Sequence, residues 1–412
     1  MTKVVVPQMA WYGDTELELA FPEQWDISVQ RMSGCAREPL DKEKMRQSFD
    51  NPLGTRRIRE LAQDKKEVAI VFDDLSRPTK AHEIIPFVLE ELEAAGIKEN
   101  QIRFIAALGA HGAMTREQLA KKLGEDIVSN YRVYNHNPYE NCVTLGFTSR
   151  GTKVAINAGL MGCDLKIAIG SVTPHPLNGF GGGGKIILPG VASMDTIEDN
   201  HKLIAKPGMS GLHPTAGLGK YEDNIMRLDI NEACRMVGLD IKIDALVNTR
   251  RETVALFVGD AEKVHEAGIE LGKELYKTVR EEDCDIAVVN AHAKVNEAAI
   301  ALNLGIQSLK KEGGDVVIIT HTPEGQIPHY LIGCFGSDLG GRMYSKRRRP
   351  AHLKRIIVYS PFVFKADEAW YGPEEIIEWA RTWDEVLELL SGKFDGAPKV
   401  AVYPDATIQY FG

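Results

Sequence analysis

A glycine-rich loop that ends in a lysine carries the most obvious chemistry of this sequence. The stretch GFGGGGKIILPG, from Gly179 to Gly190, fits two phosphate-loop patterns, G-x-x-x-x-G-K and G-x-G-x-x-G. A Walker loop needs Ser or Thr after its lysine and a helix that starts there, but Ile186 follows Lys185 and Pro189 comes soon after. A dinucleotide-binding loop also needs that helix and an adjacent strand. The loop is therefore better suited to bringing backbone N–H groups close to an anion or a flat ligand.

Reactive side chains gather in four other short stretches, three of which follow predicted strands. The stretches are FDDLSRPTK with Asp73, Asp74 and Arg77, ALGAHGAMT with His111, GSVTPHPLNG with His175, and SMDTIEDNH with Asp195, Glu198, Asp199 and His201. Open α/β sheets place their ligands at the carboxyl ends of strands. His111 lies between glycines and His175 lies between prolines. Turns of this kind seldom need an imidazole for packing, so these two histidines are candidates for catalysis.

The elements that must position these side chains are strands alternating with helices. Apolar runs at 67–75, 102–108 and 164–172 predict buried strands, and a helical pattern follows the first of them at 81–95. Thr115 is a predicted helix N-cap, and Gln118 completes a capping box. This alternation is typical of parallel sheets covered by helices.

The same alternation restarts after about Thr278, with predicted strands in CDIAVVNA, DVVIITH, RIIVYSPF and KVAVYP and helices near 296–311 and 374–390. A chain of 412 residues usually needs more than one core. We therefore predict an α/β protein of two domains, each with a mostly parallel sheet covered by helices and with the active site in the cleft between them. Residues 1–278 would form the N-terminal domain, which carries the candidate residues above, and 279–412 a smaller C-terminal domain.

Composition excludes several classes of partner. A net charge of −9 disfavours general nucleic-acid binding, and the basic run SKRRRPAHLKR is expected to be a solvated loop, with an interaction patch as the alternative. No apolar run reaches the roughly 18–20 residues that span a bilayer, so no membrane contact is expected. The six cysteines form no C-x-x-C pair. Reduced thiols and a cytoplasmic location are the expectation.

The combination of DDLSRPT, GAHGAMT, PHPLNGFGGGGKIILPG and DNH, in this order, resembles the lactate racemase family of nickel-pincer nucleotide enzymes. The resemblance implies a cofactor, pyridinium-3-thioamide-5-thiocarboxylic acid mononucleotide, attached covalently to Lys185. It also implies nickel held by the cofactor and by His201, which agrees with nickel's preference for sulfur and imidazole in square-planar sites. Asp74, Arg77 and the glycines Gly182, Gly183 and Gly184 would line the cofactor site. By the same resemblance, residues 1–278 would form the N-terminal cofactor- and nickel-binding domain, and 279–412 would contribute to the substrate cleft. Cofactor-biosynthesis enzymes would be needed for loading.

The resemblance further implies that His111 and His175 are the catalytic acid–base pair of a racemase or epimerase, an isomerase. The α-proton of a 2-hydroxy carboxylate is very weakly acidic, because the adjacent carboxylate already carries charge. Moving hydride avoids a dianion: one histidine takes the hydroxyl proton, a 2-keto acid forms, and hydride returns to the other face. General acid–base help is worth about 10²–10⁴-fold per group.

The sequence departs from the family pattern near the substrate. Gly112 and Ala113 follow His111 where the family has Arg-Pro, and Gly184 precedes the tether lysine where arginine is frequent. The segment AKVNEAAIALNLG has no lysine or glutamine at the family's substrate-contacting positions, although Lys294 or Asn296 could substitute. We therefore expect a 2-hydroxy acid other than lactate as the main substrate. The alternatives are a nucleotide-dependent transferase or kinase using the glycine loop, and a non-catalytic nucleotide- or nickel-binding homologue.

Overall fold

The computed structural model describes residues 1–204, 212–336, 338–394 and 396–412, and the chain divides into two compact units. One comprises Arg37–Lys273, and the other combines Met1–Ala36 with Glu274–Gly412. We refer to them as the middle unit and the terminal unit. In the described residues, none of the helices is both long and apolar enough to cross a membrane.

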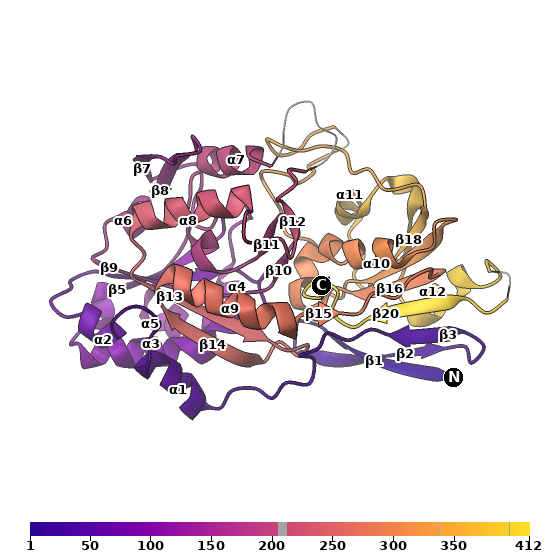
Figure 1. Ribbon diagram of the computed structural model, residues 1–412, viewed down its shortest axis with the longest axis horizontal. Helices are drawn as coiled ribbons and strands as arrows, with labels where there is room; N and C mark the ends of the chain where they lie inside the picture. Colours follow the sequence, from indigo (N-terminus) through magenta and orange to yellow (C-terminus); the bar gives the residue numbers. More distant parts are fainter. Residues whose placement is uncertain (205–211, 337, 395) are drawn as a thin grey trace. The chain divides into compact units, whose positions relative to one another are not determined.

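The middle unit is built on a six-stranded sheet in the order β14-β13-β9-β4-β5-β6. Figure 1 labels β14, β13, β9 and β5 of this sheet. Only β14 runs antiparallel to its neighbour. Every residue of β4 is buried, because both faces of this sheet are covered. The strands are β4 (Val68–Asp73), β5 (Ile102–Ala107), β6 (Arg132–Asn135), β9 (Leu165–Ser171), β13 (Ile241–Val247) and β14 (Thr253–Gly259).

The helices of the middle unit connect and cover these strands. Thr115 caps its helix together with Gln118, which confirms the predicted capping box. The helices are α1 (Lys42–Asp50), α2 (Ile58–Leu61), α3 (Ala81–Ala94), η1 (Glu99–Gln101), α4 (Arg116–Leu123), α5 (Glu125–Asn130), α6 (Ala158–Met161), η2 (Gly183–Ile186), α7 (Met194–Lys202), α8 (Ile225–Val237) and α9 (Ala261–Leu275). Smaller sheets join β7 (Cys142–Phe147) to β8 (Lys153–Asn157), and β10 (Pro174–His175) to β11 (Asn178–Phe180) and β12 (Gly217–Leu218).

The terminal unit holds a second six-stranded sheet, which is parallel throughout, in the order β19-β18-β17-β16-β20-β3. Its strands are β3 (Asp26–Val29), β16 (Ile286–Asn290), β17 (Gly314–Ile319), β18 (Leu353–Tyr359), β19 (Ile377–Ala380) and β20 (Lys399–Tyr403). The remaining elements are β1 (Thr2–Gln8), β2 (Thr15–Phe21), β15 (Lys277–Thr278), β21 (Tyr410–Phe411), η3 (His292–Ile300), α10 (Leu302–Ser308), η4 (Lys365–Asp367), α11 (Glu368–Tyr371), η5 (Glu374–Ile376) and α12 (Trp383–Leu390).

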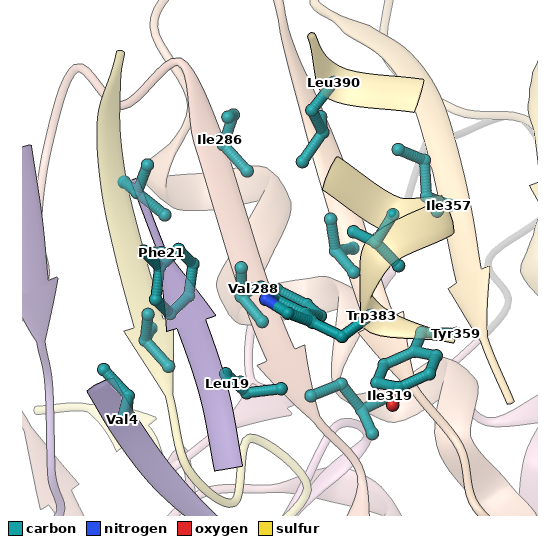
Figure 2. Close-up of a cluster of buried hydrophobic side chains, with 14 of the residues drawn as sticks. Val4, Leu19, Phe21, Ile286, Val288, Ile319, Ile357, Tyr359, Trp383 and Leu390 are labelled. Carbon is teal, nitrogen blue, oxygen red and sulfur yellow. The ribbon is translucent and has the colours of Figure 1, made fainter. Parts of the chain in front are cut away.

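The N-terminal 36 residues correct the expected domain of residues 1–278, because they belong to the terminal unit. β3 extends the terminal sheet by pairing in parallel with β20. The β1–β2 hairpin buries Val4, Leu19 and Phe21 against the terminal sheet and α12, as Figure 2 shows. The Trp383 indole N–H donates to the Ala20 carbonyl at 2.8 Å. An apolar hairpin face needs a sheet to cover it, and the nearest one in space is formed by the far end of the chain.

Two expected helices are also corrected. The pattern at 374–390 begins with the short 3-10 helix η5, continues as the edge strand β19, which pairs with β18, and becomes α-helical only at Trp383. The pattern at 296–311 is replaced by η3 and α10, with non-helical backbone at Lys294 and Glu297 inside η3.

Candidate active site

Three turns that carry candidate residues lie at one edge of the middle sheet. β4 is flanked by β5 and β9, and Phe72 in β4 is level with Ala106 in β5 and Ile169 in β9. The carboxyl ends of the three strands therefore end side by side, and Asp74, His111 and His175 follow them within a few residues. The sequence prediction of a site at strand ends agrees with this topology.

Asp74 and His111 form a buried acid–imidazole pair. Asp74 Oδ2 lies 2.6 Å from His111 Nδ1. Burial alone would raise the pKa of the Asp74 carboxyl, but His111, Arg77 and the Ser76 hydroxyl outweigh burial and lower it to about 2. An ionised carboxylate accepts only, so His111 donates its Nδ1 proton to Asp74 and keeps an unprotonated Nε2 when neutral. The pair is arranged as a general base.

The turn that carries Asp74 and Arg77 is held from inside by Lys122 of α4. The Lys122 ammonium lies 2.6 Å from Asp73 Oδ1 and donates to the carbonyls of Asp74 at 2.9 Å and Arg77 at 3.2 Å. Burial is the main cause that lowers the pKa of Lys122. The Arg77 guanidinium donates to the carbonyl and hydroxyl oxygens of Ser76 at 3.0 and 2.9 Å. This network fixes the carboxylate that orients His111.

The hydrogen bonds to His175 favour the opposite tautomer from that of His111. The backbone N–H groups of Leu177 and Asn178 donate to its Nδ1 at 3.2 and 3.4 Å. A neutral His175 ring therefore carries its proton on Nε2 and presents a donor. The two catalytic candidates are thus not equivalent: His111 is set up to accept a proton, and His175 is set up to give a hydrogen bond.

The glycine loop connects the two histidine turns. His175 pairs across strands with Gly179 at the start of the loop. The Gly109 N–H, two residues before His111, donates to the carbonyl of Gly190 at the loop's end at 2.8 Å. Lys185 lies between these anchors on η2.

Side chains from later in the sequence form hydrogen bonds with the backbone of this loop. The buried Arg227 of α8 donates to the carbonyls of Phe180 and Gly182. His265 of α9 donates from Nε2 to the carbonyl of Gly181 at 2.8 Å, since burial keeps its pKa well below the usual value and the ring neutral. Asp244 of β13 accepts the Gly183 N–H at 2.8 Å.

Packing explains why the loop is made of glycine. Gly183 has a φ of +56°, and a Cβ there would lie 2.5 Å from the His265 ring. A Cβ at Gly184 would lie 3.0 Å from Cys234 Cβ of α8. Gly183 and Gly184 are buried and Gly182 is half-buried, so this part of the loop is packed inside the middle unit. The Gly183 N–H is also committed to Asp244 rather than to a ligand.

This packing makes Gly183→Ala a test of the loop. The variant should melt at a lower temperature than Gly238→Ala, a matched control with a φ of +70° and nothing near its Cβ position. Both changes force a left-handed conformation that costs roughly 1–2 kcal/mol, but only the first adds a clash with His265. Equal melting temperatures of the two variants would contradict the close packing of Gly183 against His265.

His201, the candidate metal ligand, lies on α7. It donates from Nδ1 to the carbonyl of Ile197 at 2.8 Å, one turn earlier in the helix. Burial lowers the pKa of His201 to about 4, and the positive charge of Lys185 acts in the same direction. His201 is therefore neutral near pH 7 with an unprotonated Nε2, the state and second-shell contact that metal-ligating histidines have.

The acidic residues around His201 have other contacts. Asp199 accepts the Lys153 N–H at 3.4 Å and Glu198 pairs with Lys202 at 2.7 Å. Among the residues that the structure describes, no three His, Cys, Asp or Glu side chains gather in a way that could hold a metal. His201 is therefore suited to a metal whose other ligands come from a bound cofactor and not from the protein.

The two residues of the terminal unit that could contact substrate, Lys294 and Asn296, both lie in η3. Lys294 is buried, and its N–H donates to the Thr407 hydroxyl at 3.2 Å. The carbonyl of Asn296 accepts the Ile327 N–H at 2.9 Å.

Sequence reasoning missed the supporting residues Lys122, Arg227, Asp244 and His265. A signal exists for one of them, because IKIDALV places Lys242 and Asp244 two apart in an otherwise apolar strand. Charges inside a buried strand must find partners, and these two pair at 2.7 Å.

Comparison with known proteins gives a consistent family. Residues 12–211 match the lactate racemase N-terminal domain. The lactate racemase of Lactiplantibacillus plantarum is 29% identical over 391 residues, covering 89% of each chain. That of Thermoanaerobacterium thermosaccharolyticum is 27% identical over 431 residues, covering 98% of each. The chain is similar to these lactate racemases along most of its length. The relatives are racemases, and the chain is an isomerase of this kind.

The fold agrees with the lactate racemase family as well. The solved structure of the lactate racemase apoprotein from T. thermosaccharolyticum covers 100% of both chains with a TM-score of 0.74 at 22% identity. The predicted α/β architecture with two parallel-rich units is thereby confirmed.

Proposed function

We propose that this chain is a nickel-pincer nucleotide-dependent racemase or epimerase of a 2-hydroxy acid, acting by reversible hydride transfer through a 2-keto acid. The observation that carries the proposal is a histidine on α7 whose Nδ1 donates to the Ile197 carbonyl and whose Nε2 is left unprotonated, in a chain whose glycine loop carries Lys185. The Asp74–His111 pair at the same sheet edge supplies the base that the reaction needs.

The residues fit the cofactor in their donor chemistry. Lys185 would carry the nucleotide through its Nζ, and His201 would give nickel an imidazole ligand through Nε2. Asp74 and Arg77 would border the site, as would Gly182, Gly183 and Gly184, with the Gly183 N–H excluded from phosphate contact because Asp244 takes it. When bound, the cofactor supplies a reversible hydride acceptor.

His111 takes the first proton in this scheme. Its Nε2 accepts the hydroxyl proton of the substrate as hydride leaves the adjacent carbon, and the Asp74 carboxylate pairs with the imidazolium that results. The buried Lys122 keeps Asp74 in place throughout. This leaves a 2-keto acid. Return of hydride to one face of its carbonyl regenerates the substrate, and return to the other face gives the inverted product.

His175 needs a change before it can exchange a proton. In the observed geometry two backbone N–H groups face its Nδ1, so an imidazolium would put a third N–H against them. The ring must turn away from Leu177 and Asn178 to give or take a proton at Nε2. Until then its Nε2–H is suited to holding a substrate oxygen.

The alternatives have less support. A transferase or kinase would need free N–H groups in the glycine loop, but the Gly181 N–H donates to the Thr173 carbonyl and the Gly183 N–H donates to Asp244. A non-catalytic binder has no need of a buried Asp–His pair at the sheet edge.

Nickel binding is tested at His201. His201→Ala should lower bound nickel, measured by elemental analysis, and leave the covalent adduct on Lys185, since ligand and tether are separate groups. An unchanged ratio of nickel to protein would remove His201 from the site.

We propose further that lactate is not the main substrate. Gly112 and Ala113 provide space and no cation beside His111. A site that lacks one cationic partner loses about 1.5–3 kcal/mol of charge-assisted hydrogen bonding to a small anion, which is roughly tenfold or more in affinity. A longer acid recovers this through additional contacts, whereas lactate has no further group to offer.

A panel of single-enantiomer 2-hydroxy acids, read by chiral chromatography, measures this preference. The best substrate should have a longer or more polar side chain than lactate. Highest kcat/KM for lactate would contradict the inference from the changed residues.

The proposed partners are a small 2-hydroxy acid and the enzymes that build and load the cofactor. All six cysteines are free thiols, which supports a reducing compartment, and we propose the cytoplasm.

A further inference from the structure

The basic run before β18 is more ordered than a solvated loop, which corrects the sequence expectation. Arg355 pairs with Asp315 and with Glu378. Upstream, burial alternates: Arg347 and Arg349 are half-buried and Arg348 between them is exposed. Arg347 and Arg349 therefore face the protein, while Arg348 faces the solvent.

Both half-buried arginines contact α11. The Arg347 guanidinium lies over the Trp370 ring, 5.2 Å from its centroid. Arg349 donates from Nε to the Tyr371 carbonyl at 2.7 Å and from Nη2 to the Trp370 carbonyl at 3.4 Å. One guanidinium is stacked and the other is anchored along one edge, so both planes are fixed.

Neither arginine pairs with a carboxylate in the part of the chain that the structure describes. Nearby cations differ in this respect, since Lys346 pairs with Asp338 at 2.9 Å and Lys365 with Glu374 at 2.8 Å. Burial lowers the pKa of Arg349 to about 10, and the positive charge of Arg347 adds to the effect. Two close, partly desolvated cations without a counter-charge are unfavourable unless an anion joins them.

We propose that Arg347 and Arg349, with Trp370, form a binding site for a small oxyanion, a carboxylate or a phosphate. Guanidinium groups present planar forks that match both anions. The Nη1 group of Arg349 and the nitrogens of Arg347 make no hydrogen bond to the described residues and remain to serve as donors. The site lies wholly within the terminal unit and stands independently of the proposed racemase chemistry.

Calorimetric titration of the cofactor-free, full-length protein tests the site, with sodium phosphate and sodium succinate as separate probes at constant ionic strength. At least one probe should bind saturably, and the comparison of the two shows which oxyanion is preferred. Arg347→Gln and Arg349→Gln should each weaken binding by about tenfold or more, since each removes charged donors. Arg348→Gln, the exposed neighbour, should leave affinity unchanged.

Lysine variants test whether misfolding, and not loss of the guanidinium group, explains weaker oxyanion binding. Arg347→Lys and Arg349→Lys keep the charge and lose the fork, and should bind with intermediate affinity at an unchanged melting temperature. Saturable binding by neither probe, or equal affinity in the Arg347, Arg348 and Arg349 glutamine variants, would overturn the proposal, leaving Arg347 as a cover for Trp370.

Discussion

Lys185→Ala should yield a folded protein with no covalent cofactor and no racemase activity. The lysine is half-buried at the end of a loop that Arg227, His265 and Asp244 hold without its help. Truncating the side chain therefore removes the attachment atom and leaves the loop in place. Intact mass of protein from a cofactor-producing host measures the adduct, and the melting temperature reports the fold.

Lys202→Ala is the matched control, because Lys202 follows His201 on α7, is exposed and pairs with Glu198. This variant should keep the adduct. An adduct that survives in Lys185→Ala, or that maps to Lys202 or to Lys206, which lies outside the described residues, would remove Lys185 as the tether.

Asp74→Asn should lower kcat by about 10²–10⁴-fold while adduct and nickel remain. The N–H and hydroxyl of Ser76 both donate to Asp74 Oδ1, so an asparagine would keep its oxygen there and turn its NH₂ toward His111. His111 Nδ1 would then have to accept, its proton would move to Nε2, and the base would be lost. Steady-state kinetics on the protein loaded with cofactor measures the effect.

Asp164→Asn gives the same chemical change at the opposite end of the sheet. Asp164 accepts the N–H groups of Lys66 and Glu67 beside the amino ends of β4 and β9. Its kcat should stay near that of the unchanged protein. A fully active Asp74→Asn enzyme with normal nickel would show that the Asp74–His111 pair does not act as the base.

The sequence was sufficient for the elements that carry the candidate residues. Strong apolar runs predicted β4, β5 and β9, and the residues at their carboxyl ends followed from the rule for parallel sheets. The capping box at Thr115 was also predictable, because its signal is local.

Long-range contacts explain what the sequence analysis missed. β3 pairs with β20 across most of the chain length, and no local pattern in residues 1–36 specifies that partner. Likewise, the glycines of the loop resemble a ligand-binding ribbon when read alone, and only the positions of Arg227 and His265 show that packing requires them. The tautomers of His111, His175 and His201 depend on neighbours that spacing does not reveal.

Inversion of a single-enantiomer 2-hydroxy acid in deuterated water tests the central claim most directly. The enzyme loaded with cofactor and nickel acts on the panel's best substrate, and mass analysis of the inverted product measures deuterium at the α-carbon. Hydride transfer with His111 as the base for the hydroxyl proton predicts a product that retains its α-hydrogen. An inverted product with full deuterium at that carbon would contradict hydride transfer and require direct proton abstraction.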